Sequence, residues 1–360
     1  MVEWKKLGEV CEVLDSQRKP ISKDKRILGI YPYYGANGIQ DYVDGYIFDG
    51  TYLLVGEDGS VINKDNSPVL HWVSGQFWVN NHAHILSETN NTANLRYLYY
   101  ILQTIDVSDI VRGVPPKLNQ ANLKNISIPL PSPSEQSRIV SILDTFTASI
   151  ANLKEQIGER RKQYEHYRNQ LLQLEGKEGV EMKTLVSVAN VQYGFPFNSS
   201  LFTEDQRHIP LIRIRDIKPA HASTYYSGEV LSEYVVRRGD ILVGMDGEFN
   251  LEKWNDRDGL LNQRVLRIQG KKDICLDGYI YHYLGPVFKE IEKKTAGGSV
   301  KHLSAKVVNS IKIPLPSLSE QSRIVNILDQ FKASIANLEA QLQEREKQYE
   351  HYRNQLLTFE

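Results

Sequence analysis

The sequence predicts two mixed α/β (α+β) domains joined by two long helices, which pair antiparallel as a coiled coil with approximate two-fold symmetry. The first observation is a repeat: residues 128–175 recur as residues 313–360 with 37 of 48 positions identical. A repeat of this quality indicates that the chain consists of two related units. The second is that apolar residues in each copy alternate in steps of four and three, which is typical of a coiled-coil helix. The third is that short strand patterns and turns precede each copy.

The repeat divides the chain into four segments. Variable domains are expected at residues 1–127 and 181–312, and each is followed by a spacer helix, within residues 128–180 and 313–360. β-Branched and aromatic runs between turn residues predict strands, and two longer amphipathic segments predict helices. The expected strands are Tyr52–Val55, Phe77–Val79, Leu211–Ile214, Ile241–Val243 and Val265–Ile268, and the expected helices are Leu95–Thr104 and Tyr279–Lys294.

Each repeated segment begins with Ile-Pro-Leu-Pro, which is expected to be extended because proline lacks a backbone donor and disfavours helix before it. Ser134 is then the expected N-cap, with Glu135 in the first turn. At about 1.5 Å per residue each helix would be roughly 60 Å long. The apolar stripe, interrupted only by Arg160 in the first copy and Arg345 in the second, runs in the first copy through Ile139, Leu143, Phe146, Ile150, Leu153, Ile157, Tyr164, Tyr167, Leu171 and Leu174.

Two surfaces could cover this stripe. Each helix could pack on its own variable domain, or the two helices could pair with each other. Pairing is favoured, and the short linker at residues 176–179 indicates an antiparallel arrangement.

Composition excludes several classes of protein. No apolar run approaches the roughly 20 residues that span a bilayer, and the two cysteines, Cys11 and Cys275, favour a cytoplasmic protein. There is no phosphate-binding loop, HExxH motif or nucleophile motif, so we expect no catalysis, no metal and no cofactor bound by this chain. The net charge is −1, but residues 182–312 hold 19 Lys and Arg against 15 Asp and Glu.

The turns of both variable domains are rich in aromatic, amide and basic residues. Amide and guanidinium groups can read adenine and guanine edges, and lysines can contact phosphates, although structural turns would use similar residues. The candidates for DNA contact are Tyr33, Asn37, Asn80, Asn81, His82 and Lys117 in the first domain and Tyr193, Phe195, Arg213, Arg215, Lys218, Asn262, Gln263, Arg264 and Lys301 in the second.

The order of a variable domain, the segment IPLP-S-x-S-EQxRIVxILD and a helix ending QYxxYRxxLL, repeated once, resembles the specificity subunit of type I restriction-modification systems. The resemblance covers the whole chain, and Gly194-Phe195-Pro196-Phe197 also matches. It implies that the variable domains are DNA target-recognition domains and that the helices dock methyltransferase subunits. The candidates for docking are Glu135, Gln136, Arg138, Tyr167, Arg168, Glu320, Gln321, Arg323, Tyr352 and Arg353.

The resemblance further implies a complex of this chain with double-stranded DNA and two modification subunits. These methylate adenine N6 in a bipartite, asymmetric site with S-adenosylmethionine bound by the methyltransferase. Restriction subunits, two where they are present, would add chemistry that uses ATP and Mg²⁺. Two alternatives stay open: a coiled-coil adaptor with two domains that bind ligands other than DNA, and an enzyme with a concealed site in the variable domains.

Overall fold

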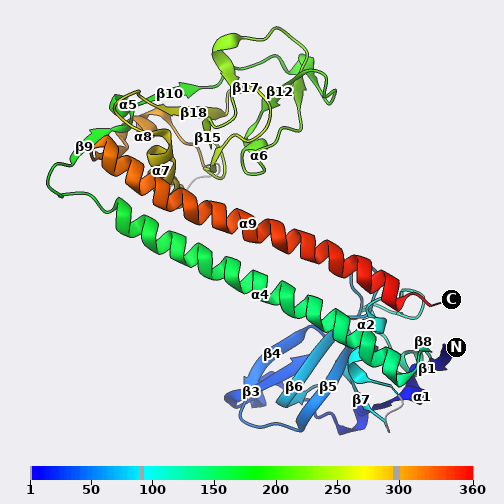
Figure 1. The fold of residues 1–360 in the computed structure, drawn as a ribbon. Helices are drawn as coiled ribbons and strands as arrows, with labels where there is room; N and C mark the ends of the chain where they lie inside the picture. Colours follow the sequence, from blue (N-terminus) through cyan, green and yellow to red (C-terminus); the bar gives the residue numbers. More distant parts are fainter. Residues whose placement is uncertain (1, 90–92, 295–300, 360) are drawn as a thin grey trace. The chain divides into compact units, whose positions relative to one another are not determined.

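The computed structural model describes residues 2–89, 93–294 and 301–359. These residues form two compact units (Figure 1). Unit 1 comprises Met1–Lys154 and Ala340–Glu360, and unit 2 comprises Glu155–Glu339. Each unit contains one variable domain and a stretch of both long helices, α4 (Pro133–Leu172) and α9 (Leu318–Leu357). The fold is therefore mixed α/β with a long helix pair, as the sequence predicts.

The first variable domain is built on a six-stranded sheet of order β2-β7-β5-β6-β3-β4, antiparallel except for the β3–β6 pair. The central strand β5 buries Leu53 and Val55 in one hydrophobic core and Leu54 in another, so both of its faces are covered. The strands are β2 (Cys11–Val13), β3 (Leu28–Gly35), β4 (Gly38–Val43), β5 (Phe48–Gly56), β6 (Leu70–Val79) and β7 (Ala83–Glu88), and the helices are α1 (Leu7–Val10), α2 (Leu95–Leu102) and α3 (Gln120–Lys124).

The second variable domain contains a four-stranded sheet of order β10-β18-β15-β16 and a five-stranded sheet of order β11-β13-β12-β17-β14. In the larger sheet β12 and β17 run parallel, whereas the other pairs are antiparallel. The strands are β10 (Ala189–Tyr193), β11 (Phe202–Thr203), β12 (Ile209–Ile212), β13 (Tyr225–Tyr226), β14 (Val235–Val236), β15 (Ile241–Gly244), β16 (Leu251–Lys253), β17 (Gly259–Leu261) and β18 (Val265–Gly270), and the helices are α5 (Leu185–Val188), α6 (Ile214–Ile217), α7 (Asp277–Lys294) and α8 (Ala305–Ser310).

The strand expected at Leu211–Ile214 is wrong at its end. β12 stops at Ile212, and α6 begins at Ile214. The Asp216 carboxylate accepts a hydrogen bond from the backbone N–H of Arg213 at 2.9 Å, which caps the helix and turns the chain out of the sheet.

The Ile-Pro-Leu-Pro segments are extended, as predicted. β8 (Ser127–Leu130) pairs with β1 (Glu3–Lys6), and β19 (Lys312–Leu315) pairs with β9 (Glu181–Thr184). A tyrosine hydroxyl donates a 2.6 Å hydrogen bond to the carbonyl of the first proline in each segment, from Tyr97 to Pro129 and from Tyr279 to Pro314. The repeated segments are thus fastened to their variable domains by equivalent contacts.

The start of the first long helix differs from the prediction by two residues. α4 begins at Pro133, and the Ser132 hydroxyl accepts a hydrogen bond from the N–H of Glu135 at 3.3 Å. Ser132 is therefore the N-cap, and Ser134 lies inside the first turn. Proline suits the first helical position because its missing donor would have no partner there.

The helices α4 and α9 pair antiparallel, as predicted (Figure 1). In unit 1 the ring of Phe146 stacks on Tyr352 with 5.2 Å between centroids, and the Arg345 guanidinium lies 5.6 Å from the Phe146 ring. In unit 2 Phe331 and Tyr167 stack at 5.3 Å, and Arg160 lies 5.8 Å from Phe331. The two arginines that interrupt the apolar stripes thus cover aromatic rings, where a cation is favourable.

The ends of the helices belong to the cores of the variable domains. Ile139 and Leu143 near the start of α4, together with Leu357 at the end of α9, are buried in the core of unit 1. Ile324 near the start of α9 and Leu174, just after α4, are buried in the core of unit 2. The apolar stripe is therefore covered in both of the ways considered. One stretch of each helix packs against the other helix, and the ends pack against the variable domains.

Within the described residues no helix combines the length and the apolar character that crossing a bilayer requires.

Candidate nucleic-acid interface

Five of the residues proposed to contact DNA meet at one cavity of about 510 Å³ in the second variable domain. The cavity is also lined by four residues that are not among the candidates for DNA contact: Phe197, Ser199, Phe202 and Ile214. The five predicted residues are Arg213, Arg215, Asn262, Gln263 and Arg264.

The parallel pairing of β12 and β17 explains why these residues meet. Arg213 follows the last residue of β12, and Asn262 follows the last residue of β17. Neighbouring parallel strands end at the same edge of a sheet, which is where α/β sheets form their binding crevices. Arg213 and Asn262, 49 positions apart in the chain, are thereby brought to one site.

Gly194 allows a third segment to close against this edge. A Cβ at this position would lie 2.0 Å from the carbonyl oxygen of Asn262, so a side chain here would collide with backbone. Phe195 donates its N–H to the Leu261 carbonyl at 2.9 Å and packs on Phe197 with 5.1 Å between ring centroids. Phe195 therefore does not line the cavity but belongs to an aromatic cluster with Phe197, which does.

Three arginine side chains line the cavity, and their contacts differ. Arg264 is paired with Asp246 at 3.0 Å, and Arg215 donates to the Thr224 hydroxyl at 2.7 Å. The Arg213 guanidinium lies 6.0 Å from the Phe202 ring, and within the described part of the chain no carboxylate lies within ion-pair distance of it. Arg213 is thus available to an acceptor brought from outside, such as a phosphate or a guanine edge.

The amides of the cavity differ in exposure. Asn262 is 8% exposed, and its side-chain oxygen accepts the N–H of Gln263 at 2.9 Å. Gln263 is exposed, and its side-chain amide has no hydrogen-bond partner within the part of the chain that the structure describes. Gln263 is therefore the better placed of the two to read a base.

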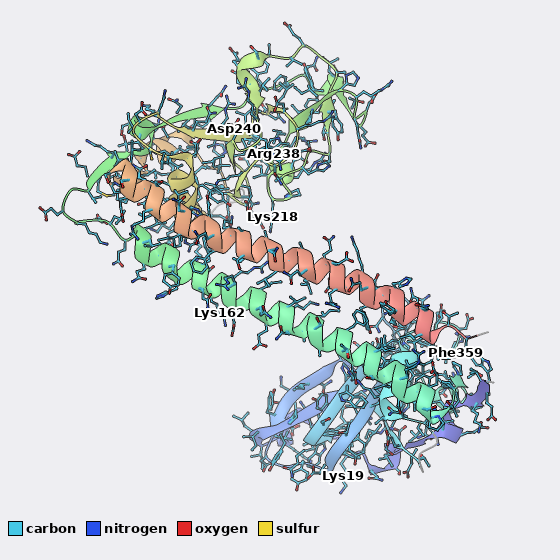
Figure 2. The ribbon with its side chains drawn as sticks, in the orientation of Figure 1. Lys19, Lys162, Lys218, Arg238, Asp240 and Phe359 are labelled. Atoms are coloured by element: carbon cyan, nitrogen blue, oxygen red, sulfur yellow. The ribbon has the colours of Figure 1, made fainter. Side chains whose placement is uncertain are left out.

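Lys218, Lys301 and Tyr193 lie elsewhere. Lys218, which is labelled in Figure 2, is the C-cap of α6 and lines a separate cavity of about 440 Å³. Lys301 pairs with Glu292 at 3.0 Å. Tyr193 packs against the core of unit 2, where its hydroxyl is buried and burial raises its pKa. None of the three belongs to the Arg213 cavity.

In the first variable domain Asn81, His82 and Lys117 gather at the turn after β5. Lys117 lies 3.3 Å from Glu57, and His82 lies 3.6 Å from Asp58. The Arg18 guanidinium donates to the Asn81 carbonyl at 3.4 Å. Asn81 and Lys117 are exposed and His82 is half-buried, so polar and charged side chains reach the surface here as well.

The turn that Lys117 contacts has an equivalent in the second variable domain, and the same backbone contacts stabilise both turns. The N–H of Gly59 donates to the Pro116 carbonyl at 2.9 Å, and the N–H of Gly247 donates to the Lys301 carbonyl at 3.0 Å. Asp58 pairs with Lys117 and Asp246 with His302 as isolated β-bridges. Position by position, His302 therefore matches Lys117, and Lys301 matches Pro116.

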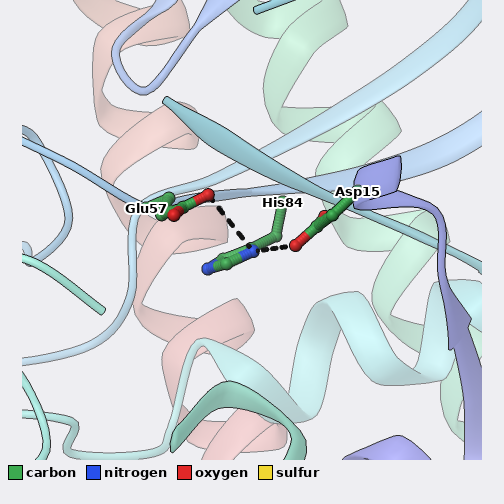
Figure 3. Close-up of side chains that lie close together, drawn as sticks. All are labelled: Asp15, Glu57 and His84. Atoms are coloured by element: carbon green, nitrogen blue, oxygen red, sulfur yellow. Dashed lines mark hydrogen bonds and ion pairs between the residues drawn. The ribbon is translucent and has the colours of Figure 1, made fainter. Parts of the chain in front are cut away.

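Beneath this turn lies a buried group of Asp15, Glu57 and His84 (Figure 3). The Nδ1 of His84 is 2.6 Å from Asp15, and its Nε2 is 2.8 Å from the Leu118 carbonyl. Both ring nitrogens therefore lie within hydrogen-bond distance of an oxygen atom. Contacts from His84 and other neighbours hold the pKa of Asp15 below its usual value against the effect of burial. We interpret this group as an ion-pair cluster that holds the turn.

Burial removes two candidates of the first domain from the surface. Tyr33 is 1% exposed, and its hydroxyl accepts the N–H of Ile21 at 2.9 Å. Asn80 is 3% exposed and donates to the Gln40 side chain at 3.1 Å. Asn37, in the turn between β3 and β4, is exposed.

Gln136 and Gln321, proposed to dock partners, are also buried. The Gln136 side chain donates to the Pro131 carbonyl at 2.9 Å and accepts the N–H of Asn94 at 2.9 Å. Gln321 donates to the Pro316 carbonyl at 3.0 Å and accepts the N–H of Leu276 at 2.9 Å. Both therefore clamp the start of a long helix to its variable domain and offer nothing to a partner.

The other docking candidates lie nearer to solvent. The exposed Arg138 and Arg323 each form a two-pronged ion pair with the glutamate three residues earlier, Glu135 or Glu320. Tyr167 and Tyr352 are each 42% exposed although one ring face is stacked. Arg168 lies 5.5 Å from the Tyr164 ring, and Arg353 lies 5.9 Å from Tyr349, both half-buried.

The chain belongs to the family of type I restriction-modification specificity subunits. The sequence model described as "Type I restriction modification DNA specificity domain" matches residues 1–160 and 177–347. Specificity subunits are the non-catalytic members of these enzymes, and the chain is therefore not itself an enzyme.

Individual relatives agree with this assignment. A Haemophilus influenzae protein named as a type I restriction enzyme specificity subunit, S.HindORF215P, is 34% identical over 99% of this chain and 96% of its own length. The EcoR124I/EcoR124II specificity subunit of Escherichia coli is 29% identical over 99% of this chain and 94% of its own. The crystal structure of a type I S subunit from M. genitalium has the same fold, with a TM-score of 0.73 and 16% identity over 100% of this chain and 97% of that chain.

Proposed function

We propose that this chain reads DNA for a type I restriction-modification complex, each variable domain recognising one half of a bipartite, asymmetric site. The α4–α9 pair would set the gap between the half-sites. Because the variable domains differ in sequence and structure, the two half-sites would differ too.

The observation that carries the proposal is the Arg213 cavity. Arginine and glutamine side chains at one sheet edge offer the donors and acceptors that read base edges in the major groove. Among the described residues the Arg213 guanidinium has no carboxylate partner, and Gln263 is exposed. The modest basic surplus of the second domain fits a mode in which partner subunits supply much of the contact with phosphates.

The same proposal assigns the docking of two adenine-N6 methyltransferase subunits to the helix starts. The Glu135–Arg138 and Glu320–Arg323 pairs are exposed and identical in both copies, as two equal partners would require. The methyltransferases would bind S-adenosylmethionine, and restriction subunits, where present, would use ATP and Mg²⁺. No cofactor is assigned to this chain.

Arg213→Ala tests the reading role of the cavity in the assembled methyltransferase. Loss of a two-pronged contact to guanine should weaken specific DNA binding by roughly 1–3 kcal/mol and relax the sequence preference of one half-site. Binding to matched and mismatched duplexes measures both effects.

Arg207→Ala is the matched control, because Arg207 is exposed and already paired with Asp205 at 2.5 Å. Equal effects of the two substitutions, or none from Arg213→Ala, would speak against the cavity as a reading site. An assembly that prefers no split duplex sequence would instead favour the adaptor alternative.

A further inference from the structure

Most contacts between α4 and α9 do not distinguish the two helices, because the helices have nearly the same sequence. Residue 331 corresponds to residue 146, and residue 352 corresponds to residue 167. The Phe146–Tyr352 stack in unit 1 is therefore the same contact as the Phe331–Tyr167 stack in unit 2. Two α4 helices, or two α9 helices, paired in this register would form these stacks equally well.

Two ion pairs between the helices break this equivalence. Lys154 lies 2.9 Å from Glu346 in unit 1, and Arg161 lies 2.6 Å from Glu339 in unit 2. Residue 339 corresponds to residue 154, and residue 346 corresponds to residue 161. At the same two positions of the repeat, α4 thus carries two cations and α9 carries two carboxylates.

This charge difference bears on the choice of partner. In a pair of two α4 helices, Lys154 of each copy would face Arg161 of the other. In a pair of two α9 helices, Glu339 would face Glu346. We infer that these four charges commit each long helix to the dissimilar copy, so that every helix pair carries one variable domain of each kind.

The effect is one of selectivity more than of stability. The four side chains are 44% to 63% exposed, and exposed ion pairs contribute little to folding. Specificity, however, is a difference between alternatives, and the symmetric contacts cancel in that difference. Attraction in the α4–α9 pair and repulsion in both pairs of identical helices contribute to this difference in the same direction. Charges that flank the seam of a coiled coil select partners in this way. Salt should weaken the preference, because these charges are accessible to ions.

An exchange of one position between the helices reverses the expected preference. Arg161→Glu/Glu346→Arg keeps composition and net charge, but it places Lys154 opposite an arginine and Glu339 opposite a glutamate. Two copies of the same helix would then have opposite charges at both facing positions and would attract each other. The control Lys154→Glu/Arg161→Glu/Glu339→Lys/Glu346→Arg reverses all four charges and preserves attraction only between unlike helices.

The full chain is folded first and is then cut at a specific protease site inserted between Lys177 and Glu178. This linker is exposed, and the insertion keeps Gly176 and Gly179, whose φ values of 77° and 75° favour glycine. Native mass spectrometry at low salt then counts mixed and like fragment pairs. Exchange between isotope-labelled and unlabelled wild-type fragments sets the incubation time.

We expect mixed pairs from the wild type and from the fourfold reversal. We expect the ratio of mixed to like pairs to fall by about tenfold or more in Arg161→Glu/Glu346→Arg, and to recover at high salt. Mixed pairs that persist in this variant would overturn the inference. Its separation into single fragments without like pairs would also overturn it, because the charges would then stabilise pairing without choosing the partner.

Discussion

At the scale of single residues, polar side chains of the repeated motif have two different roles. Gln136 and Gln321 are buried clamps, whereas Arg138 and Arg323 lie on the surface. The motif EQxR predicts that these residues matter, but it cannot separate the two roles, since a buried hydrogen bond and a partner contact both require a polar residue. Which carbonyl lies beside the amide depends on the tertiary fold. The same limit applies to Tyr33.

Replacing the clamp should therefore affect folding, and replacing the surface arginine should not. Gln321→Ala leaves the N–H of Leu276 and the Pro316 carbonyl without their buried partner and should lower the free energy of unfolding by about 1–3 kcal/mol. Arg323→Ala removes an exposed ion pair and should change this free energy by less than about 0.5 kcal/mol. Denaturant unfolding measures both, and equal losses would contradict the assigned roles.

At the scale of elements, the spacing of apolar residues predicts two long helices and their antiparallel pairing, and both are present. The spacing does not predict whether a variable domain or the other helix covers a given stretch of the apolar stripe, because both surfaces are apolar. The end of α4 is an example. Tyr164 lies over the second variable domain, where its hydroxyl is 3.0 Å from Nδ1 of His282 on α7, and Nε2 of His282 is 2.8 Å from Asp329 on α9.

This three-helix contact predicts a pH dependence of stability. Burial lowers the pKa of His282 from 6.5 to about 4, with smaller contributions from Lys253 and Lys332, although Asp329 opposes the shift. The unfolded chain then binds a proton that the folded chain excludes, so the free energy of unfolding should decrease as the pH falls from about 6.5 to about 4.

His282→Gln should make this decrease shallower, because glutamine does not titrate. His166→Gln, at an exposed position of α4, should leave it unchanged. Denaturant unfolding across this pH range gives the slopes. If His282→Gln has the slope of the wild type, another group is responsible.

At the scale of the whole molecule, the repeat predicts two units, and the chain does form two compact ones. The sequence does not predict how they are composed, because the end of each long helix completes the core of the variable domain that belongs to the other half of the chain. The sequence predicts the arginines and amides of the Arg213 cavity as candidates for DNA contact, but it does not predict that they meet. The parallel pairing of β12 and β17 that joins them leaves no mark in the local sequence.

The most direct test of the account is an exchange of one variable domain. Residues 1–127 are replaced by the corresponding domain of another specificity subunit, and the chain is expressed with its methyltransferase partner. Sequencing of the methylated adenines then defines the recognised site. We expect one half of the split sequence to change while the other half stays as in the wild type. A change in both halves, or in neither, would contradict the claim that each variable domain reads its own half-site.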